Sequence, residues 1–201
     1  AEALNNLGNM LKETGDDDAA LETYRCVIAL RPDHADSYSN LGVLLRKRGR
    51  TAEALEAYQQ AIKLDAHHAD ALHNLGNLLQ GLSRWDEAAA AYRKALAYRP
   101  NRDDTYAELG RTYCRAGRLD EAARLYRDWL ERDPANPIAQ HLAAAVSGGA
   151  GPDRASEAYV RRTFDGFAET FDEVLQRLDY RVPDLIAEAL DRDLVSTREA
   201  D

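Results

Sequence analysis

The 201-residue sequence predicts an all-α protein, an α-solenoid built from stacked pairs of short helices. Two observations lead to this prediction. Helix-favouring Ala, Leu, Glu and Arg dominate the composition, whereas Pro occurs only six times. The sequence also resembles itself at an offset of 34 residues, the period of a helix–turn–helix repeat. Helices of about 13 residues are marginal alone in water, so stacking of neighbouring units must stabilise them.

Each unit carries the same small and aromatic residues at the same places. We expect Gly and Ala where two helices cross closely, and a Tyr four residues after the Ala to lie on the same helical face and fill the space between units. The first half of each unit holds the pairs Leu7-Gly8, Leu41-Gly42, Leu75-Gly76 and Leu109-Gly110, and the second half holds Ala20 and Tyr24, Ala54 and Tyr58, Ala88 and Tyr92, and Ala122 and Tyr126.

Glycine and proline mark the predicted ends of the helices. Glycine ends the first helix of three units, and proline stops the second helix before the next unit. The residues concerned are Gly15, Gly49 and Gly117, followed by Pro32, Pro100 and Pro134, with Ala66 in the second unit. The predicted units are 1–34, 35–68, 69–102 and 103–136.

On these residues the chain resembles the tetratricopeptide repeat family over 1–136. The resemblance implies a right-handed superhelix in which first helices line a concave groove and second helices form the outer wall. It also implies that the chain is a protein-interaction scaffold that docks a peptide or another extended protein segment in that groove.

In this family the groove is lined chiefly by repeat positions 2, 5, 6, 9, 12 and 13. An Asn amide can grip a peptide group without reading its side chain, and three in register would form a ladder. The resemblance is closer to the repeats of O-GlcNAc transferases than to carboxylate-binding clamps, because position 2 is acidic. The alternative is that these Asn side chains are solvated or satisfy neighbouring helix ends. The candidate groove residues are Asn6, Asn9, Asn40, Asn74, Asn77, Glu108 and Arg111.

Other residue types indicate no catalytic, cofactor or metal site. His67, His68 and His73 lie close together in sequence, but no Cys or spaced carboxylate completes a tetrahedral set, so we interpret them as surface residues. Cys26 and Cys114 fit no metal or redox spacing and are expected to be buried. Two tryptophans, Trp85 and Trp129, are expected to pack in second helices.

The regular pattern breaks after residue 136. Residues 137–151 form a fifth first helix without the Leu-Gly pair, followed by a Gly-rich break. Residues 152–201 are interpreted as amphipathic helices that lead to a missing catalytic domain. Their apolar stripe includes Phe164, Phe167 and Phe171, which is either a cap on the last repeat or the contact surface of a homodimer.

Residues 134–195 resemble the region that joins repeats to the catalytic domain in tetratricopeptide-linked, class I S-adenosylmethionine-dependent methyltransferases. The resemblance rests on Phe164-Asp165, Ala168 and Phe171-Asp172. No glycine-rich turn follows to hold the cofactor. The alternative function is therefore the substrate-recruiting part of a methyltransferase, whereas this chain itself is not expected to be an enzyme.

Charge and hydropathy exclude further classes. A net charge of −9 argues against nucleic acid as a partner. No apolar run approaches the ~18 residues of a membrane helix, and no signal peptide is visible, so we expect a cytoplasmic protein. Arg outnumbers Lys 22 to 4, which suggests a GC-rich bacterial source. The sequence begins at the first position of a repeat, which is compatible with further repeats upstream.

Overall fold

The computed structural model describes residues 2–146, which form α-helices joined by short turns. The first helices of the units are α1 (Glu2–Glu13), α3 (Ala35–Lys47), α5 (Ala69–Gly81) and α7 (Asp103–Arg115). The second helices are α2 (Asp17–Leu30), α4 (Thr51–Leu64), α6 (Trp85–Tyr98) and α8 (Leu119–Arg132), and α9 (Pro137–Val146) follows. These bounds fall within the predicted units, and the eight helices of the four pairs are 12 to 14 residues long.

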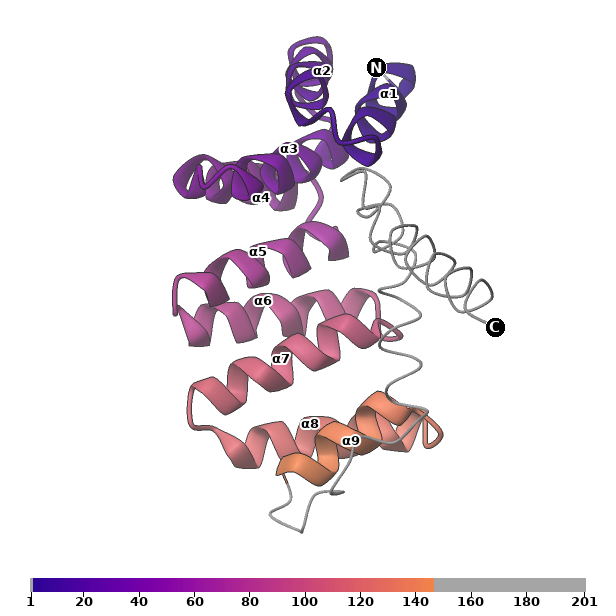
Figure 1. Ribbon diagram of the computed structural model, residues 1–201, viewed down its shortest axis with the longest axis vertical. Helices are drawn as coiled ribbons and strands as arrows, with labels where there is room; N and C mark the ends of the chain where they lie inside the picture. The colour runs from indigo at the N-terminus through magenta and orange to yellow at the C-terminus, as the bar shows by residue number, and fades with distance from the viewer. Residues whose placement is uncertain (1, 147–201) are drawn as a thin grey trace, which may run out of the picture. The chain divides into compact units, whose positions relative to one another are not determined.

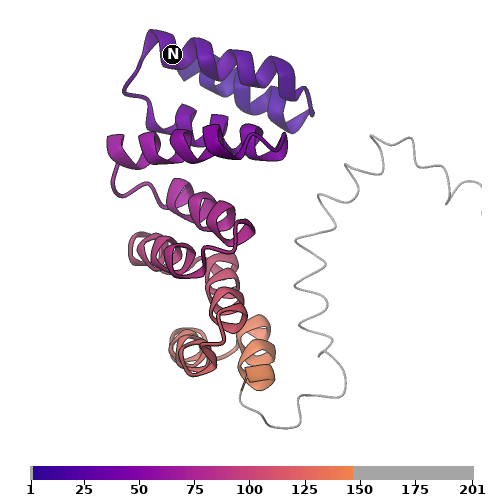
Figure 2. The ribbon, with the colours of Figure 1, turned by 90° about the vertical axis from the view of Figure 1, so that its left-hand side faces the viewer.

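The helices pack as antiparallel pairs, and the pairs follow one another in chain order (Figures 1 and 2). Within a unit the first helix contacts the second helix, and each second helix contacts the first helix of the next unit. First helices also contact each other, α3 with α5, α5 with α7 and α7 with α9. The first helices therefore share one face of the stack, where their side chains can meet.

The Gly–Tyr pairs hold each unit together internally. The Tyr24 ring lies on Gly8, and a β-carbon on that glycine would stand 2.7 Å from Tyr24 Cε1. The same contact would be 2.6 Å between Gly42 and Tyr58 Cε1. All four tyrosine rings are buried (Tyr24, Tyr58, Tyr92 and Tyr126). The tyrosine therefore packs between the two helices of its own unit, whereas the sequence placed it in the space between units.

The turns within the units confirm the role of glycine at repeat position 15. The three predicted glycines, Gly15, Gly49 and Gly117, have φ between +73° and +79°, a conformation that glycine adopts without a steric penalty. In the third unit Ser83 occupies this position and also has a positive φ, of 58°. The turn imposes a positive φ on the residue at position 15, the second residue after the end of the first helix, whether it is Gly or Ser.

The two tryptophans of the second helices differ in burial. As predicted, Trp129 packs in the core, where it stacks on Tyr106 with ring centroids 4.9 Å apart. Trp85 is only half-buried, at the start of α6, with the guanidinium of Arg115 over its ring. The prediction of burial is wrong for Cys26, which is exposed on the outer face of α2, because its repeat position faces solvent.

The helix predicted from Pro137 is present as α9, which contacts α7 and α8. The predicted Gly-rich break, the amphipathic segment 152–201 and the Phe164, Phe167 and Phe171 stripe lie outside the described residues. The division of the chain into domains therefore stays a prediction.

Candidate functional site

A polar hollow of about 390 Å³ lies across the first helices of units one to three. Its volume falls within the range of ligand-binding clefts in proteins, about 300–1,000 Å³. Val43 is the sole large apolar side chain among its lining residues. The others are Asn5, Asn9 and Lys12 of α1, Asp36, Ser39 and Asn40 of α3, His68, and Asp70 and Asn74 of α5.

Two of the three central asparagines in the hollow are held by the protein itself. Asn9 Oδ1 accepts a hydrogen bond from the Tyr24 hydroxyl at 2.7 Å and another from Asn40 Nδ2 at 3.1 Å. Asn40 Oδ1 in turn accepts from Lys12 Nζ at 3.0 Å. Within residues 2–146, Asn74 makes no side-chain hydrogen bond, so both its oxygen and its amide group can serve a ligand.

Lys12 is a cation placed inside this hollow. Desolvation of its half-buried side chain lowers the pKa of Lys12, and the carboxylate of Glu13 partly opposes the shift. Its ammonium keeps further donors besides the bond to Asn40, because an ammonium carries three N–H groups. Lys12 therefore holds Asn40 in place and also offers a hydrogen-bond donor to a ligand.

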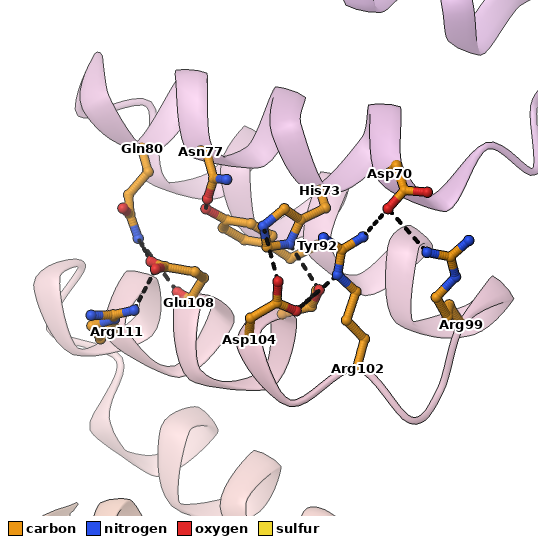
Figure 3. A network of polar contacts seen from close by, with 11 residues as sticks. Asp70, His73, Asn77, Gln80, Tyr92, Arg99, Arg102, Asp104, Glu108 and Arg111 are labelled. Atoms are coloured by element: carbon orange, nitrogen blue, oxygen red, sulfur yellow. Dashed lines mark hydrogen bonds and ion pairs between the residues drawn. The ribbon is translucent and has the colours of Figure 1, made fainter. Parts of the chain in front are cut away.

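The acidic row at repeat position 2 is largely paired by residues of the loops between units. Asp70 accepts from Arg102 and, at 3.0 Å, from Arg99 (Figure 3). Asp104 accepts from Arg102 Nε at 2.8 Å. Burial alone would raise the pKa of Asp104, but the hydrogen bond from Arg102 and the nearby His73 hold it below its usual value. Asp36 remains the most exposed carboxylate of the hollow, with 66% of its side chain accessible.

Units three and four carry a second polar cluster, which is closed by internal contacts (Figure 3). Asn77 Oδ1 accepts from the Tyr92 hydroxyl at 2.7 Å. Gln80 Nε2 donates to Glu108 Oε2 at 3.1 Å, and Arg111 pairs with the other oxygen of that carboxylate. The oxygen atoms of Asn77 and Glu108 that a ligand would have to engage here already accept hydrogen bonds within the protein.

His73 belongs to this cluster and is buried, with 7% of its side chain accessible. Its Nδ1 lies 2.8 Å from Thr105 Oγ1, and its ring packs edge-on against Tyr92. Desolvation lowers the pKa of His73, and Asp104 opposes the shift. The interpretation of the histidines as surface residues is wrong for His73 and His68, because both face neighbouring first helices. The side chain of His68 is 90% buried. His67 is exposed, as predicted.

The structure thus divides the candidate groove residues into two groups. Asn9, Asn40 and Asn74 line the hollow, whereas Asn77, Glu108 and Arg111 belong to the closed cluster. Asn6 is exposed and does not line the hollow. The hollow is also lined by residues that were not among the sequence candidates: Lys12 and His68, together with Asn5, Asp36, Ser39, Val43 and Asp70.

The missed residues carry signals that a repeat alignment could have used. Lys12 stands at position 12, one of the groove positions implied by the family resemblance. His68 stands at position 34, where the first unit has His34, and both histidines precede a first helix.

Two further findings bear on the class of protein. Between residues 2 and 146, no three His, Cys, Asp or Glu side chains are grouped so that they could hold a metal ion. In the same range the longest helices have 14 residues, whereas a bilayer span requires about 20 apolar residues, so none of them can cross a membrane.

Solved structures share this fold at low sequence identity. A crystal structure of MamA is 22% identical, with a TM-score of 0.62 over 86% of this chain and 97% of that chain. PilF of Pseudomonas aeruginosa is 21% identical, with a TM-score of 0.64 over 87% of this chain and 75% of that chain. A mutant O-GlcNAc transferase of Thermobaculum terrenum is 24% identical, with a TM-score of 0.60 over 66% of this chain and 26% of that chain. These likenesses show the fold alone.

Comparisons of sequence give the family. No curated protein matches the chain. Two tetratricopeptide repeat models match, one at residues 1–67 and 34–101 and the other at 79–146. These matches end at residue 146, so the resemblance of the following segment to methyltransferases stays a prediction. The repeat matches and the stacked helical pairs together show that the chain belongs to the tetratricopeptide repeat family.

Proposed function

We propose that the chain is a protein-interaction module that binds an extended polypeptide segment in the hollow between α1, α3 and α5. The observation that carries the proposal is the polar hollow itself, to which three consecutive first helices each contribute an asparagine: Asn9, Asn40 and Asn74. A scaffold role is consistent with the tetratricopeptide repeat fold.

The chemistry of the lining favours a main chain as the ligand. A nearly all-polar hollow offers little apolar surface to a hydrophobic side chain or a lipid. An extended segment presents its unpaired N–H and C=O groups along its whole length. Asn74 can donate to one carbonyl and accept from one N–H, which suits a peptide group regardless of its side chain.

The mixed charges disfavour a strongly anionic ligand. Lys12 is the only cation among the lining residues that carries a fixed charge, whereas Asp36 and Asp70 add two carboxylates. Arg99 and Arg102 pair with Asp70, which leaves Asp36 as the main unbalanced acid. The hollow therefore suits a segment that is neutral or carries a basic residue near Asp36.

The closed cluster sets the expected extent of the bound segment. Asn77 Oδ1 and both carboxylate oxygens of Glu108 accept hydrogen bonds within the protein, whereas the side chain of Asn74, one turn earlier on α5, makes none within residues 2–146. Adjacent helix axes lie about 8–10 Å apart, and an extended chain advances about 3.3 Å per residue. Three first helices therefore accommodate about five or six residues.

The test uses a 12-residue peptide selected against the full chain from a displayed random-sequence library, with affinity measured by fluorescence anisotropy. We expect Asn74→Ala to weaken binding about 5- to 150-fold, because two hydrogen bonds contribute about 1–3 kcal/mol net. Asn77→Ala is the matched control: it removes the same side chain from the same helix but outside the hollow, and binding should change less than 2-fold.

Two outcomes would contradict the proposal. One is that no peptide can be selected from the library. The other is that the selected peptide binds the Asn74→Ala variant as tightly as the unaltered chain, or that Asn77→Ala weakens binding as much as Asn74→Ala does.

A further inference from the structure

One buried group in the hollow lacks a hydrogen-bond partner. The Nε2 atom of His68 is buried and forms no hydrogen bond with any residue between 2 and 146. It lies 3.1 Å from Asp36 Oδ1, but the two groups are not aligned as donor and acceptor. Buried polar atoms without a partner are rare in native proteins, and each requires an explanation.

The other ring nitrogen fixes the chemical character of this group. His68 is the N-cap of α5, and its Nδ1 accepts a hydrogen bond from the backbone N–H of Ala71 at 3.3 Å. A nitrogen that accepts a hydrogen bond carries no proton, so the neutral ring must carry its proton on Nε2. The capping bond therefore makes Nε2 a hydrogen-bond donor.

The preceding unit provides an internal comparison. His34 caps α3 in the same way, and its Nδ1 accepts from the backbone N–H of Ser37 at 3.3 Å. His34 is not among the residues that line the hollow, whereas His68 is. Capping accounts for both histidines, but it gives the second nitrogen of His68 no aligned acceptor, since the nearby Asp36 Oδ1 forms no hydrogen bond with it.

We infer that His68 Nε2–H donates a hydrogen bond to a main-chain carbonyl oxygen of the bound segment. This inference rests on the proposed function and adds a recognition residue to it. His68 and Asn74 both line the hollow, so one can hold a carbonyl of the segment while the other holds a neighbouring peptide group. The two carboxylates of the lining make a neutral carbonyl a better ligand here than a terminal carboxylate.

The experiment compares His68→Ser with His34→Ser in the full chain. Serine is a favoured N-cap residue, so both variants keep the capping acceptor and lose the imidazole. The probe is the selected 12-residue peptide with an amidated C-terminus, titrated by fluorescence anisotropy. We expect His68→Ser to weaken binding about 3- to 10-fold, the effect of one net hydrogen bond, and His34→Ser to change it less than 2-fold.

A backbone-ester scan of the peptide separates a direct contact from a structural effect. Replacing one amide by an ester weakens the acceptor strength of that carbonyl. Against the unaltered chain, one ester position should lose affinity, and that loss should disappear against His68→Ser. Such non-additivity identifies groups in contact, whereas a displaced helix would weaken all positions alike.

The possible results separate this inference from the proposed function. If Asn74→Ala weakens binding but His68→Ser does not, or if no ester position is coupled to His68, the inference is wrong and the hollow still binds a peptide. If binding requires a free C-terminal carboxylate, His68 serves an anion and the inference is also wrong. If neither Asn74→Ala nor His68→Ser affects binding, the proposed function itself fails.

Discussion

Removing the tyrosine hydroxyls one at a time tests the packing of the repeat, because identical side chains have different partners in different units. The Tyr92 hydroxyl donates to Asn77 Oδ1 at 2.7 Å, and the Tyr24 hydroxyl donates to Asn9 Oδ1 at the same distance. In the second unit Val43 replaces the asparagine. The buried Tyr58 hydroxyl consequently lacks an asparagine acceptor and forms no well-aligned hydrogen bond within residues 2–146, although the guanidinium of Arg46 lies nearby.

The structure gives an expected order of stability changes. Tyr92→Phe should cost about 1–1.5 kcal/mol, because it removes a hydrogen bond and leaves Asn77 Oδ1 without its donor. Tyr24→Phe should cost about 0.5–1 kcal/mol, because Asn9 Oδ1 keeps the bond from Asn40. Tyr58→Phe should be neutral or stabilising by up to about 1 kcal/mol, since it removes a buried hydroxyl that forms no well-aligned hydrogen bond.

The electrostatic environment of Tyr58 agrees with this expectation. Burial raises the pKa of Tyr58 to about 12, and the nearby guanidinium of Arg46 opposes the shift only in part. Burial, with a contribution from Glu13, likewise raises the pKa of Tyr24 to about 12. Both tyrosines are fully buried, and the main difference between them is the hydrogen bond that the Tyr24 hydroxyl donates to Asn9.

The assay is equilibrium urea denaturation followed by circular dichroism, with the midpoints compared at a common m-value. A loss of 1 kcal/mol corresponds to about 2–4 °C in Tm for a chain of this size. Equal losses for all three variants would refute the reasoning, because tyrosine would then act by ring packing alone. A loss above about 1 kcal/mol for Tyr58→Phe would refute it as well.

Three further predictions concern single positions of the array. Gly42→Ala should lower the unfolding free energy by about 1–3 kcal/mol in urea denaturation, because its β-carbon would stand 2.6 Å from Tyr58 Cε1. Ser83→Gly should raise the melting temperature by about 1–2 °C by relieving a positive φ, whereas Gly49→Ala, at the same turn position, should lower it. His73→Gln should flatten the fall in stability as the pH drops below about 6.5. Burial lowers the pKa of His73, so the folded chain binds fewer protons than the unfolded chain and loses stability as pH falls, which denaturation at several pH values would measure.

The repeat pattern predicted the helices well because the same packing and turn requirements recur in every unit. A Leu-Gly pair marks a close helix crossing, and the turn after each first helix requires a left-handed residue. Ser83 is a position that this pattern does not identify. It carries none of the glycine signal, yet its turn takes the same conformation as those at Gly49 and Gly117, because the packing of the flanking helices dictates it.

The site was less predictable because one residue type can have opposite environments. Asn74 and Asn77 stand three residues apart on α5, but Asn77 is bonded to Tyr92 and Asn74 is not. The sequence does contain a signal for this difference, since an asparagine at position 9 stands 15 residues before a tyrosine in the first and third units. Reading that signal requires knowing that the two positions meet across the helix pair.

The histidines could not be placed from sequence for a related reason. His67, His68 and His73 occur within seven residues, and nothing in their spacing tells an exposed ring from a buried one. The environment of His68 depends on the cap of α5, and that of His73 depends on residues more than 30 positions later, such as Thr105.

NMR of the asparagine side-chain amides shows whether a segment binds in the hollow. The signals are followed while the selected peptide is titrated into the ¹⁵N-labelled full chain. We expect the Asn74 side-chain N–H₂ signals to shift most, those of Asn40 and Asn9 to shift with the same saturation, and those of Asn77 to stay in place. Shifts centred on Asn77, or saturable binding that leaves the Asn74 signals unmoved, would contradict this expectation.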